Sequence, residues 1–319
     1  YGLDADLIFL SMALSNVNIH LFRESDLNIQ DNTDVLFKYL SIENLSNSLV
    51  QEINVLNFDI DDQRFINDFI VLGKLLGNDF LPHIPCIDIS VNGIDILLQE
   101  YTYMMKKYKT HLVNPITNKI DNKMLKCILD NIVEEEDNLL RMVHQKQVRV
   151  FKNKLPNSMI DTLEIEKWTY EHVFPRQEDY VKTGTRGWRR RWYEHNLNVD
   201  MKNKQEIWKI CRSYWKTVAW SYQYYQSGVP DWHWFYPYHY TPTLRDLRDT
   251  LNHFDFNKVN FEQKFPLSPF QQLLVVLPPQ SSSFLPSSYQ WLTSSSNTPI
   301  SDYYPKHFDE DETRACKRW

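Results

Sequence analysis

Apolar residues recur at intervals of three or four positions through most of the chain, which is the spacing of a helix with one buried face. The pattern is clearest over 61–76, where Gly77 and Asn78 follow as a helix stop. The other segments with this spacing are 4–14, 34–55, 93–107, 122–150, 204–225 and 270–277. Polar and apolar residues alternate over 18–23, which predicts a short strand. The sequence therefore predicts a mainly α fold with a small α/β part at the N-terminus.

The remaining stretches show no regular period. Residues 153–200 are polar and aromatic, and the tail from 265 is rich in Pro and Ser. A length of 319 residues fits two domains or one large one. No run reaches the roughly 18–20 apolar residues of a membrane span, so we expect no membrane partner. The chain begins without Met and inside an acidic motif, and we interpret it as a fragment.

The cysteines indicate a reducing environment. Cys86, Cys127, Cys211 and Cys316 are far apart and form no CxxC pair. The usual zinc spacing is therefore absent, and a chain of this size does not need a disulfide framework. We expect an intracellular protein, with the cytoplasm favoured over the nucleus.

Basic residues gather in the middle of an otherwise acidic chain. Residues 141–217 hold 17 Lys or Arg and 9 Asp or Glu, a net charge of +8, whereas the whole chain has −6 and the remainder therefore −14. A concentrated basic segment is the usual electrostatic mark of nucleic-acid binding. The candidate phosphate contacts are Arg186, Arg189, Arg190 and Arg191. The alternative for such a run is a solvated helix face.

Two acidic segments place carboxylates beside apolar residues. Asp4 and Asp6 lie in YGLDADLI at the N-terminus, and Asp79 lies 75 residues after Asp4, in GNDFLPH. An ionised carboxylate at the edge of a buried element is costly unless a cation or hydrogen bonds compensate it. Three such groups from two elements suit Mg²⁺ or Mn²⁺. The alternative is that each Asp caps a helix or makes a turn.

Three other polar residues are less specific candidates. His83 and His239 could act as general bases, but a metal-activated water needs none, so we expect both to pack or to cap. Lys74 lies about one turn before the Asp79 motif. We expect its side chain to extend over the apolar surface and to leave the amine in solvent, instead of contacting a phosphate.

Several long blocks of the chain closely resemble the XRN-type 5′→3′ exoribonucleases, and they occur in the family's order. The blocks are YGLDADLI (1–8), RE (23–24), DFIVLGKLLGNDFLPHIP (68–85), GWRRRWY (187–193), GVPDWHWFYPYHY (228–240), FPLSPFQQL (265–273), LP (277–278), SSFLP (282–286) and SDYYP (301–305). The blocks are long and aromatic, and they extend over nearly the whole chain.

The resemblance implies the edge of a PIN- or flap-nuclease-like core joined to a helical domain. It assigns 1–90 to the C-terminal part of the metal-binding core and 91–319 to the XRN helical domain. It maps Asp4, Asp6 and Asp79 onto catalytic metal ligands, with Asp4 the most peripheral, and implies Mg²⁺ or Mn²⁺ as the cofactor. In the family, further acidic ligands and the basic pocket for the 5′-phosphate lie well before YGLDADLI, and this chain lacks them.

The resemblance implies stepwise hydrolysis of 5′-monophosphorylated RNA to nucleoside monophosphates by metal-ion catalysis. It also implies that the missing N-terminal nuclease half is a partner of this chain in that reaction. Trp232 and Trp234 flank His233, so on a strand they would share one face. We expect one of them to stack on an RNA base, the alternative being core packing.

Two other functions stay open at this point. The chain could be a non-catalytic RNA-binding or structural remnant that keeps its aspartates by descent, or a structure-specific flap-type nuclease, which shares the two-metal chemistry. Scarce Gly, abundant Asn and a short 110–200 region also resemble the composition of proteins from large DNA viruses.

Overall fold

The structure is a computed structural model, in which the chain forms two compact units. It describes every residue except Leu3, Trp319 and the segments 15–17, 25–36, 55–60, 152–179, 295–296, 305–308 and 312–315. The first unit comprises Tyr1–Gln147, Tyr180–Pro230 and Trp234–Glu262, and the second comprises Val148–Asp179, Asp231–His233 and Gln263–Trp319. The mainly helical fold is confirmed, whereas the domain boundary near residue 90 stays a prediction.

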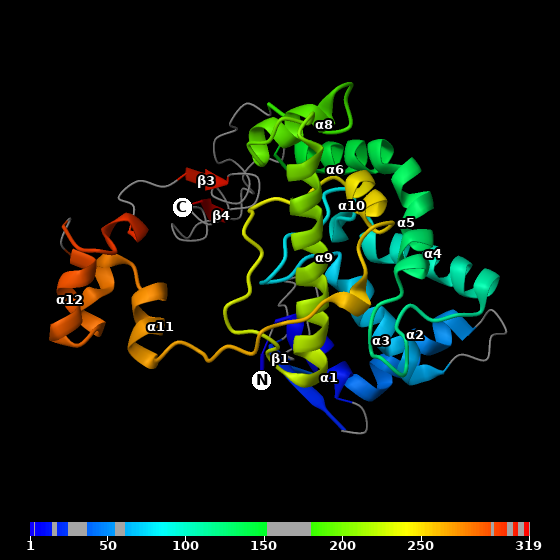
Figure 1. Ribbon diagram of the computed structural model, residues 1–319. Coiled ribbons are helices and arrows are strands. Elements are labelled where there is room, and N and C mark those ends of the chain that lie inside the picture. The colour runs from blue at the N-terminus through cyan, green and yellow to red at the C-terminus, as the bar shows by residue number, and fades with distance from the viewer. Residues whose placement is uncertain are drawn as a thin grey trace, which may run out of the picture. The chain divides into compact units, whose positions relative to one another are not determined.

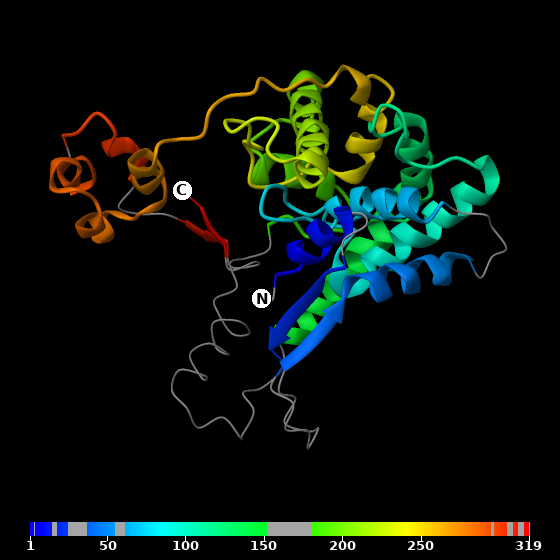
Figure 2. The same cartoon turned by 90° about the horizontal axis from the view of Figure 1, so that it is seen from below.

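Helices form most of the first unit, as Figure 1 shows. The helices are α1 (Asp6–Ala13), α2 (Ile42–Asn54), α3 (Asp62–Lys74), α4 (Gly93–Tyr108), α5 (Asn122–Glu134), α6 (Glu136–Phe151), α8 (Trp188–Arg191), α9 (Lys204–Ser227) and α10 (Leu244–Thr250), with short 3₁₀ turns η1 (Ile89–Val91) and η3 (Phe256–Lys258). Strands β1 (His20–Glu24) and β2 (Phe37–Ser41) pair antiparallel, with His20 opposite Ser41. Figure 2 shows this pair as two blue arrows.

Helix α3 forms because its sequence supplies a cap, an apolar face and a stop. The carboxylate of Asp61 accepts a 3.0 Å hydrogen bond from the backbone N–H of Arg64, which satisfies one free donor of the first turn. The apolar face, which includes Phe65, is buried. Gly77 ends the segment at φ 89°, where an added Cβ would lie 2.7 Å from the backbone N of His83. The predicted helix and its predicted stop are both confirmed.

Helix α9 runs through the core of the first unit. Asn203 caps it by accepting from the backbone N–H of Glu206 at 3.2 Å. Trp215 is fully buried, and its indole N–H donates to the carbonyl of Leu247 at 3.0 Å. The helix packs against α1, α3 and α10, and Figure 1 shows one end of it beside α1.

The prediction of a helix over 34–55 is wrong at residues 37–41, while 34–36 and 55 lie outside the described residues. Residues 37–41 form β2, and 42–54 are helical as predicted. The rings of Phe37 and Tyr39 lie 4.8 and 4.9 Å from the ring of Phe22 on β1. These cross-strand aromatic pairs and the backbone pairing outweigh the helical spacing of the apolar residues.

The single helix predicted over 122–150 is divided into α5 and α6 at Glu135. Glu136 directs its carboxylate into the protein, where it accepts a 2.7 Å hydrogen bond from the backbone N–H of Leu244. The irregular region predicted over 153–200 also contains helix, since α8 continues into a π-helical turn, η2 (Trp192–Asn196). Residues 152–179 lie outside the described part of the chain.

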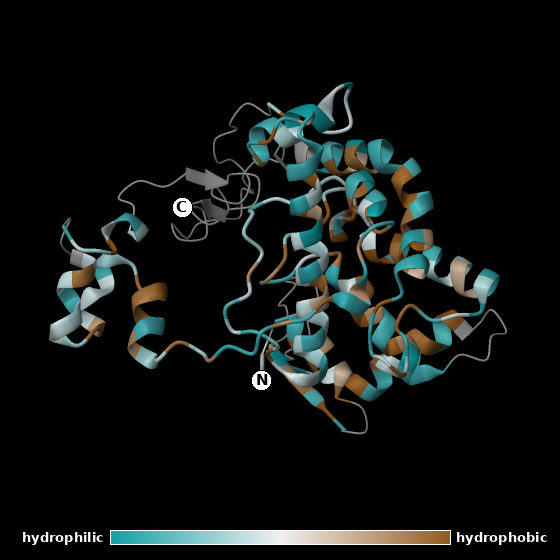
Figure 3. Cartoon of the chain, viewed as in Figure 1, coloured by the Kyte–Doolittle hydropathy of each residue, from teal (hydrophilic) through white to brown (hydrophobic). Residues whose placement is uncertain are grey.

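The described part of the second unit consists of short elements with exposed apolar side chains. They are α11 (Pro269–Val276), η4 (Pro279–Phe284), α12 (Ser287–Ser294), η5 (Ser301–Tyr303), β3 (Asp309–Asp311) and β4 (Cys316–Arg318). Helix α11 confirms the helical turn predicted at 270–277, and Ser268 and Gln271 cap it reciprocally. None of its residues is buried, and Figure 3 shows its apolar positions in brown.

The described helices and cysteines bear on the expected absence of a membrane span and of a disulfide framework. None of the described helices combines the length and the apolar character needed to span a bilayer. Cys86, Cys127 and Cys211 are free thiols. Burial raises the pKa of Cys211 to about 12, so this thiol is not a reactive thiolate at neutral pH.

Candidate metal centre

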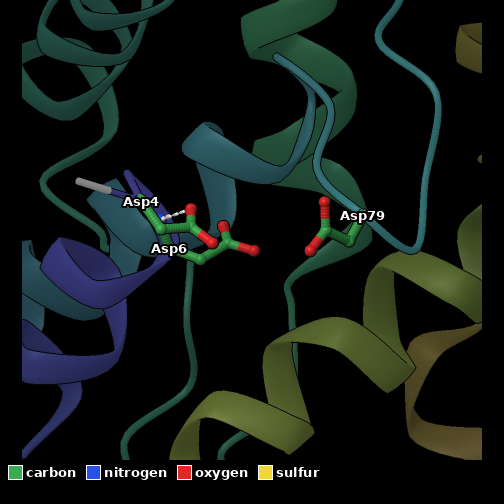
Figure 4. A group of neighbouring side chains, drawn as sticks. All are labelled: Asp4, Asp6 and Asp79. Carbon is green, nitrogen blue, oxygen red and sulfur yellow. Dashed lines mark hydrogen bonds between the residues drawn. The ribbon is translucent and has the colours of Figure 1, made fainter. Parts of the chain in front are cut away.

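The structure brings Asp4, Asp6 and Asp79 together in the first unit. Each contributes a carboxylate oxygen, and these three oxygens all lie within 4.8 Å of one another. Figure 4 shows the carboxylate of Asp79 facing the other two from the opposite side. Asp4 and Asp79 are exposed and Asp6 is half-buried. The proximity predicted from two distant motifs is therefore confirmed, while the metal-ligand role of the three residues stays a prediction.

The N-terminal side of the cluster is held by backbone hydrogen bonds. The Oδ1 atom of Asp4 accepts from the backbone N–H of Asp6 at 2.9 Å, a local bond that orients Asp4. Two residues before Asp4, the backbone N–H of Gly2 donates to the carbonyl of Phe22 at 3.2 Å and ties the segment to β1. Asp6 then occupies the first turn of α1, where the helix dipole favours a negative charge.

The Asp79 side of the cluster is a tight turn. The backbone N–H of Asn78 donates to the carbonyl of Leu81 at 2.9 Å, and the Asn78 side-chain oxygen accepts from the backbone N–H of Phe80 at 3.0 Å. These bonds fix the residues on both sides of Asp79. The sequence predicts a turn here, and the hydrogen bonds explain why Asn stands before the aspartate.

Helix α9 supports this turn from the other side. The side-chain amide of Asn78 donates to Oγ of Ser221 at 3.0 Å. The ring of Phe80 packs edge-on against the rings of Trp220 and Tyr224, with centroids 5.0 and 5.4 Å away. Asp79 therefore lies between two residues that α9 holds.

Lys74 is buried beside the acidic cluster instead of lying at the surface. Its side chain is 2 % exposed, so the predicted surface position is wrong. The amine lies 2.8 Å from the ring centroid of Tyr225 on α9. Burial lowers the pKa of Lys74 to about 6, and the opposing effect of the Asp6 carboxylate is smaller. Burial, followed by the proximity of Asp6, also raises the pKa of Tyr225. The packing of α3 between α1 and α9 encloses this lysine.

Asp68 is a buried anchor that sequence reasoning did not single out. Its carboxylate is fully buried and accepts hydrogen bonds from Tyr101, His111, Leu112 and Val113 at 2.7–2.9 Å. These bonds fix the segment after α4 against α3. The sequence feature that could have revealed this anchor is the presence of an acidic residue within the apolar run FINDFIVL.

Trp232 and Trp234, the predicted base-stacking residues, do not lie on a strand. Asp231 accepts a 2.9 Å hydrogen bond from the backbone N–H of His233, which makes a turn instead of a strand. Trp232 and Trp234 therefore do not share a strand face. Trp232 is exposed, whereas the indole N–H of Trp234 donates to Thr217 at 3.1 Å and Lys216 lies over its ring. The RNA contact of either residue stays a prediction.

The predicted phosphate-binding arginines fall into two groups. Arg189 forms a 2.8 Å ion pair with Asp246, and Arg191 donates to three acceptors of its own loop. Both guanidinium groups therefore have structural partners. Arg186 and Arg190 are exposed, and Arg190 lies 3.6 Å from Glu194. Their role toward RNA stays a prediction.

The chemistry of the acidic cluster fits a hard divalent cation. All three groups are carboxylates, and their separation lets one ion, or two neighbouring ions, contact each of them. Three negative charges at this distance repel one another unless a cation compensates them. His83 lies 3.6 Å from Asp88, consistent with a packing role.

Comparison with known proteins identifies the family. A family model described as the Xrn1 helical domain matches residues 59–170 and 166–318. The chain is 28 % identical to human 5'-3' exoribonuclease 1 over an alignment of 367 positions, which covers all of this chain and 21 % of the human protein. It is 26 % identical to Arabidopsis thaliana 5'-3' exoribonuclease 2 over an alignment of 434 positions, which again covers all of this chain and 42 % of that protein.

A shorter match has a higher sequence identity. Over 142 residues, or 44 % of this chain, it is 39 % identical to 5'-3' exoribonuclease 2 of Cryptococcus neoformans. These relatives are eukaryotic and lend no support to a viral origin. The chain spans less than half the length of each of them. The family model extends over most of the chain, and the chain therefore belongs to the XRN family of 5′→3′ exoribonucleases.

Proposed function

We propose that this chain is part of the catalytic region of a metal-dependent 5′→3′ exoribonuclease that hydrolyses 5′-monophosphorylated RNA stepwise to nucleoside monophosphates. The observation that carries the proposal is the convergence of Asp4, Asp6 and Asp79 in a chain of the XRN family. The relatives named 5'-3' exoribonucleases support the reaction class and its direction. We expect the protein to work in the cytoplasm.

The three aspartates would hold Mg²⁺ or Mn²⁺. A divalent cation at this position would activate water and stabilise the negative charge that develops on the phosphate. The chain's own contribution is to hold the carboxylates apart at a fixed distance. The Asp4–Asp6 bond fixes one side, and Asn78 and Phe80 fix the other against α9.

We propose that the isolated chain has little or no activity. Three carboxylates on one open face leave a cation with few protein ligands, and Asp4 and Asp79 are exposed to solvent. The chain also spans only part of its relatives' length. The remaining ligands and the grip on the 5′-phosphate would come from the missing N-terminal nuclease half, which we propose as its partner.

Two measurements test this proposal. Mn²⁺ binding is measured by calorimetry for the chain, for Asp6→Asn and for Asp95→Asn, an exposed aspartate on α4 that serves as the matched control. We expect only Asp6→Asn to weaken binding. RNA hydrolysis is then compared between the chain alone and a longer form that restores the preceding residues of its reading frame.

Each outcome has a clear meaning. Hydrolysis by the longer form and not by the chain alone supports the proposal. Strong hydrolysis by the chain alone would contradict the account of missing ligands. If neither form hydrolyses RNA although Mn²⁺ binds, the non-catalytic remnant is favoured.

A further inference from the structure

We propose that one face of α9, formed by Lys209, Arg212 and Lys216, binds the phosphates of single-stranded RNA. The inference deepens the proposed function because it rests on RNA as the substrate. It names a surface different from the arginine run at 186–191.

The three basic residues share one side of the helix. Their spacing of three and four positions places them in one row, which extends about 10 Å along the helix axis. Lys209 and Arg212 are exposed and Lys216 is half-buried. The row is therefore longer than the spacing between neighbouring phosphates of one strand.

Acidic residues are missing from the same stretch. Residues 207–227 contain these three basic residues and no Asp or Glu, in a chain whose net charge is −6. The closest acidic residue in the helix is Glu206, 3.3 Å from Lys209. That pair is a surface ion pair, because the Lys209 side chain is 68 % exposed, and such a pair is weak enough for a phosphate to replace it.

An ordinary solvated helix face would normally mix both signs of charge. Here the positive charges form an uninterrupted row, and an aromatic segment lies alongside. Trp234 in that segment is half-buried, and its indole N–H donates to Thr217 at 3.1 Å. The amine of Lys216 lies 4.0 Å from the centre of the Trp234 ring. A basic row beside aromatic side chains is the arrangement that binds single strands without sequence preference.

The row and the candidate metal centre lie on different sides of α9. Ser221, which holds Asn78, and Tyr225, which lies beside Asp6, follow Lys216 by five and nine residues and are therefore turned about 140° and 180° around the helix axis. The row is a surface separate from the three aspartates.

The test measures RNA binding in EDTA, so that no metal is needed and no hydrolysis occurs. A fluorescent single-stranded RNA is titrated with the chain over a range of salt concentrations. The triple variant K209Q/R212Q/K216Q is compared with K106Q/K107Q/K109Q, which removes the same charge from exposed positions at the end of α4. For three lost phosphate contacts, the slope of log affinity against log salt should fall by about 2.

We expect the α9 variant to show this loss and to bind at least about tenfold more weakly at low salt, while the α4 control keeps the wild-type slope. An equal loss in both variants, an unchanged slope in the α9 variant, or no RNA binding by the wild-type chain would overturn the inference. Equally tight binding of poly-L-glutamate would also overturn it, because the face would then recognise acidic polypeptides.

The result is separable from the proposed nuclease activity. Hydrolysis is assayed with Mg²⁺ in the longer form, whereas this binding is measured without metal in the chain itself. An unchanged salt slope together with active hydrolysis refutes only the α9 surface.

Discussion

The side-chain amide of Asn78 donates a 3.0 Å hydrogen bond to Oγ of Ser221, a residue 143 positions later in the chain. Ser221 is fully buried in the C-terminal third of α9, and Asn78 directly precedes Asp79. The bond joins the turn that presents a candidate ligand to the longest packed element of the first unit. It makes the geometry of the acidic cluster depend on a helix that contributes no carboxylate.

Replacing Ser221 by Ala should therefore loosen the Asp79 turn. The substitution removes the acceptor and leaves a half-buried amide unsatisfied, at a cost of about 1 kcal/mol of unfolding free energy. We expect weaker Mn²⁺ binding in calorimetry, with the helical circular dichroism retained. Ser213→Ala, two turns earlier in α9, is the matched control. Unchanged Mn²⁺ affinity in Ser221→Ala would show that the bond does not position Asp79.

Lys74 should give the protein a distinctive pH dependence. Its pKa is about 6 in the folded chain and near 10.5 in the unfolded one, so the unfolded state binds more protons between these values. Stability should rise with pH across that window and should fall as pH drops toward 6. Lys74→Met should flatten this slope in urea unfolding measured in EDTA. The exposed Lys106→Met should keep the wild-type slope; a Lys74→Met protein with the same slope would contradict the shifted pKa.

Glu136 should act in the opposite direction at lower pH. Burial raises its pKa from 4.5 to about 7, so the folded state binds more protons than the unfolded state between these values. Its contribution to stability is full below about 4.5 and is lost as pH rises through 7. Glu136→Gln keeps an acceptor for the Leu244 N–H and should remove that slope. The exposed neighbour Glu135→Gln is the control, and equal slopes in the two variants would refute the assignment.

Asp68 should be among the most costly positions to change. Asp68→Asn places an amide N–H group against donors from Tyr101, His111 and the backbone, in a site without solvent. Disrupting a buried charged network costs about 3–5 kcal/mol. Urea unfolding should show a loss of that size, while Asp62→Asn on the exposed first turn of the same helix should change little. A loss below about 1 kcal/mol would mean that the network relaxes around the amide.

The features that sequence reasoning predicted correctly are governed by local chemistry. The helix over 61–76, its stop at Gly77 and the apolar period of α9 depend on residues close in the chain, so one sequence reveals them. The proximity of Asp79 to the N-terminal aspartates was expected because each lies at the end of a predicted element within a family motif.

The features that sequence reasoning missed depend on residues that meet only in the folded chain. Residues 37–41 pair with β1 because the Phe22 ring lies opposite, and no local signal distinguishes that strand from a helix start. Lys74 occupies a helix position that looks exposed, yet α1 and α9 both cover it. The turn at Trp232 follows from one Asp231 hydrogen bond, which an alternating pattern does not reveal.

The position of α9 beside both halves of the cluster makes cation binding and helix stability thermodynamically linked. A ligand that binds only the folded arrangement raises the free energy of unfolding by an amount set by its concentration relative to Kd. Since Ser221 and Tyr225 are only four residues apart, that gain would be transmitted to one cooperative segment of α9. Heat unfolding of the helical core would then report, without any substrate, how tightly the three aspartates hold an ion.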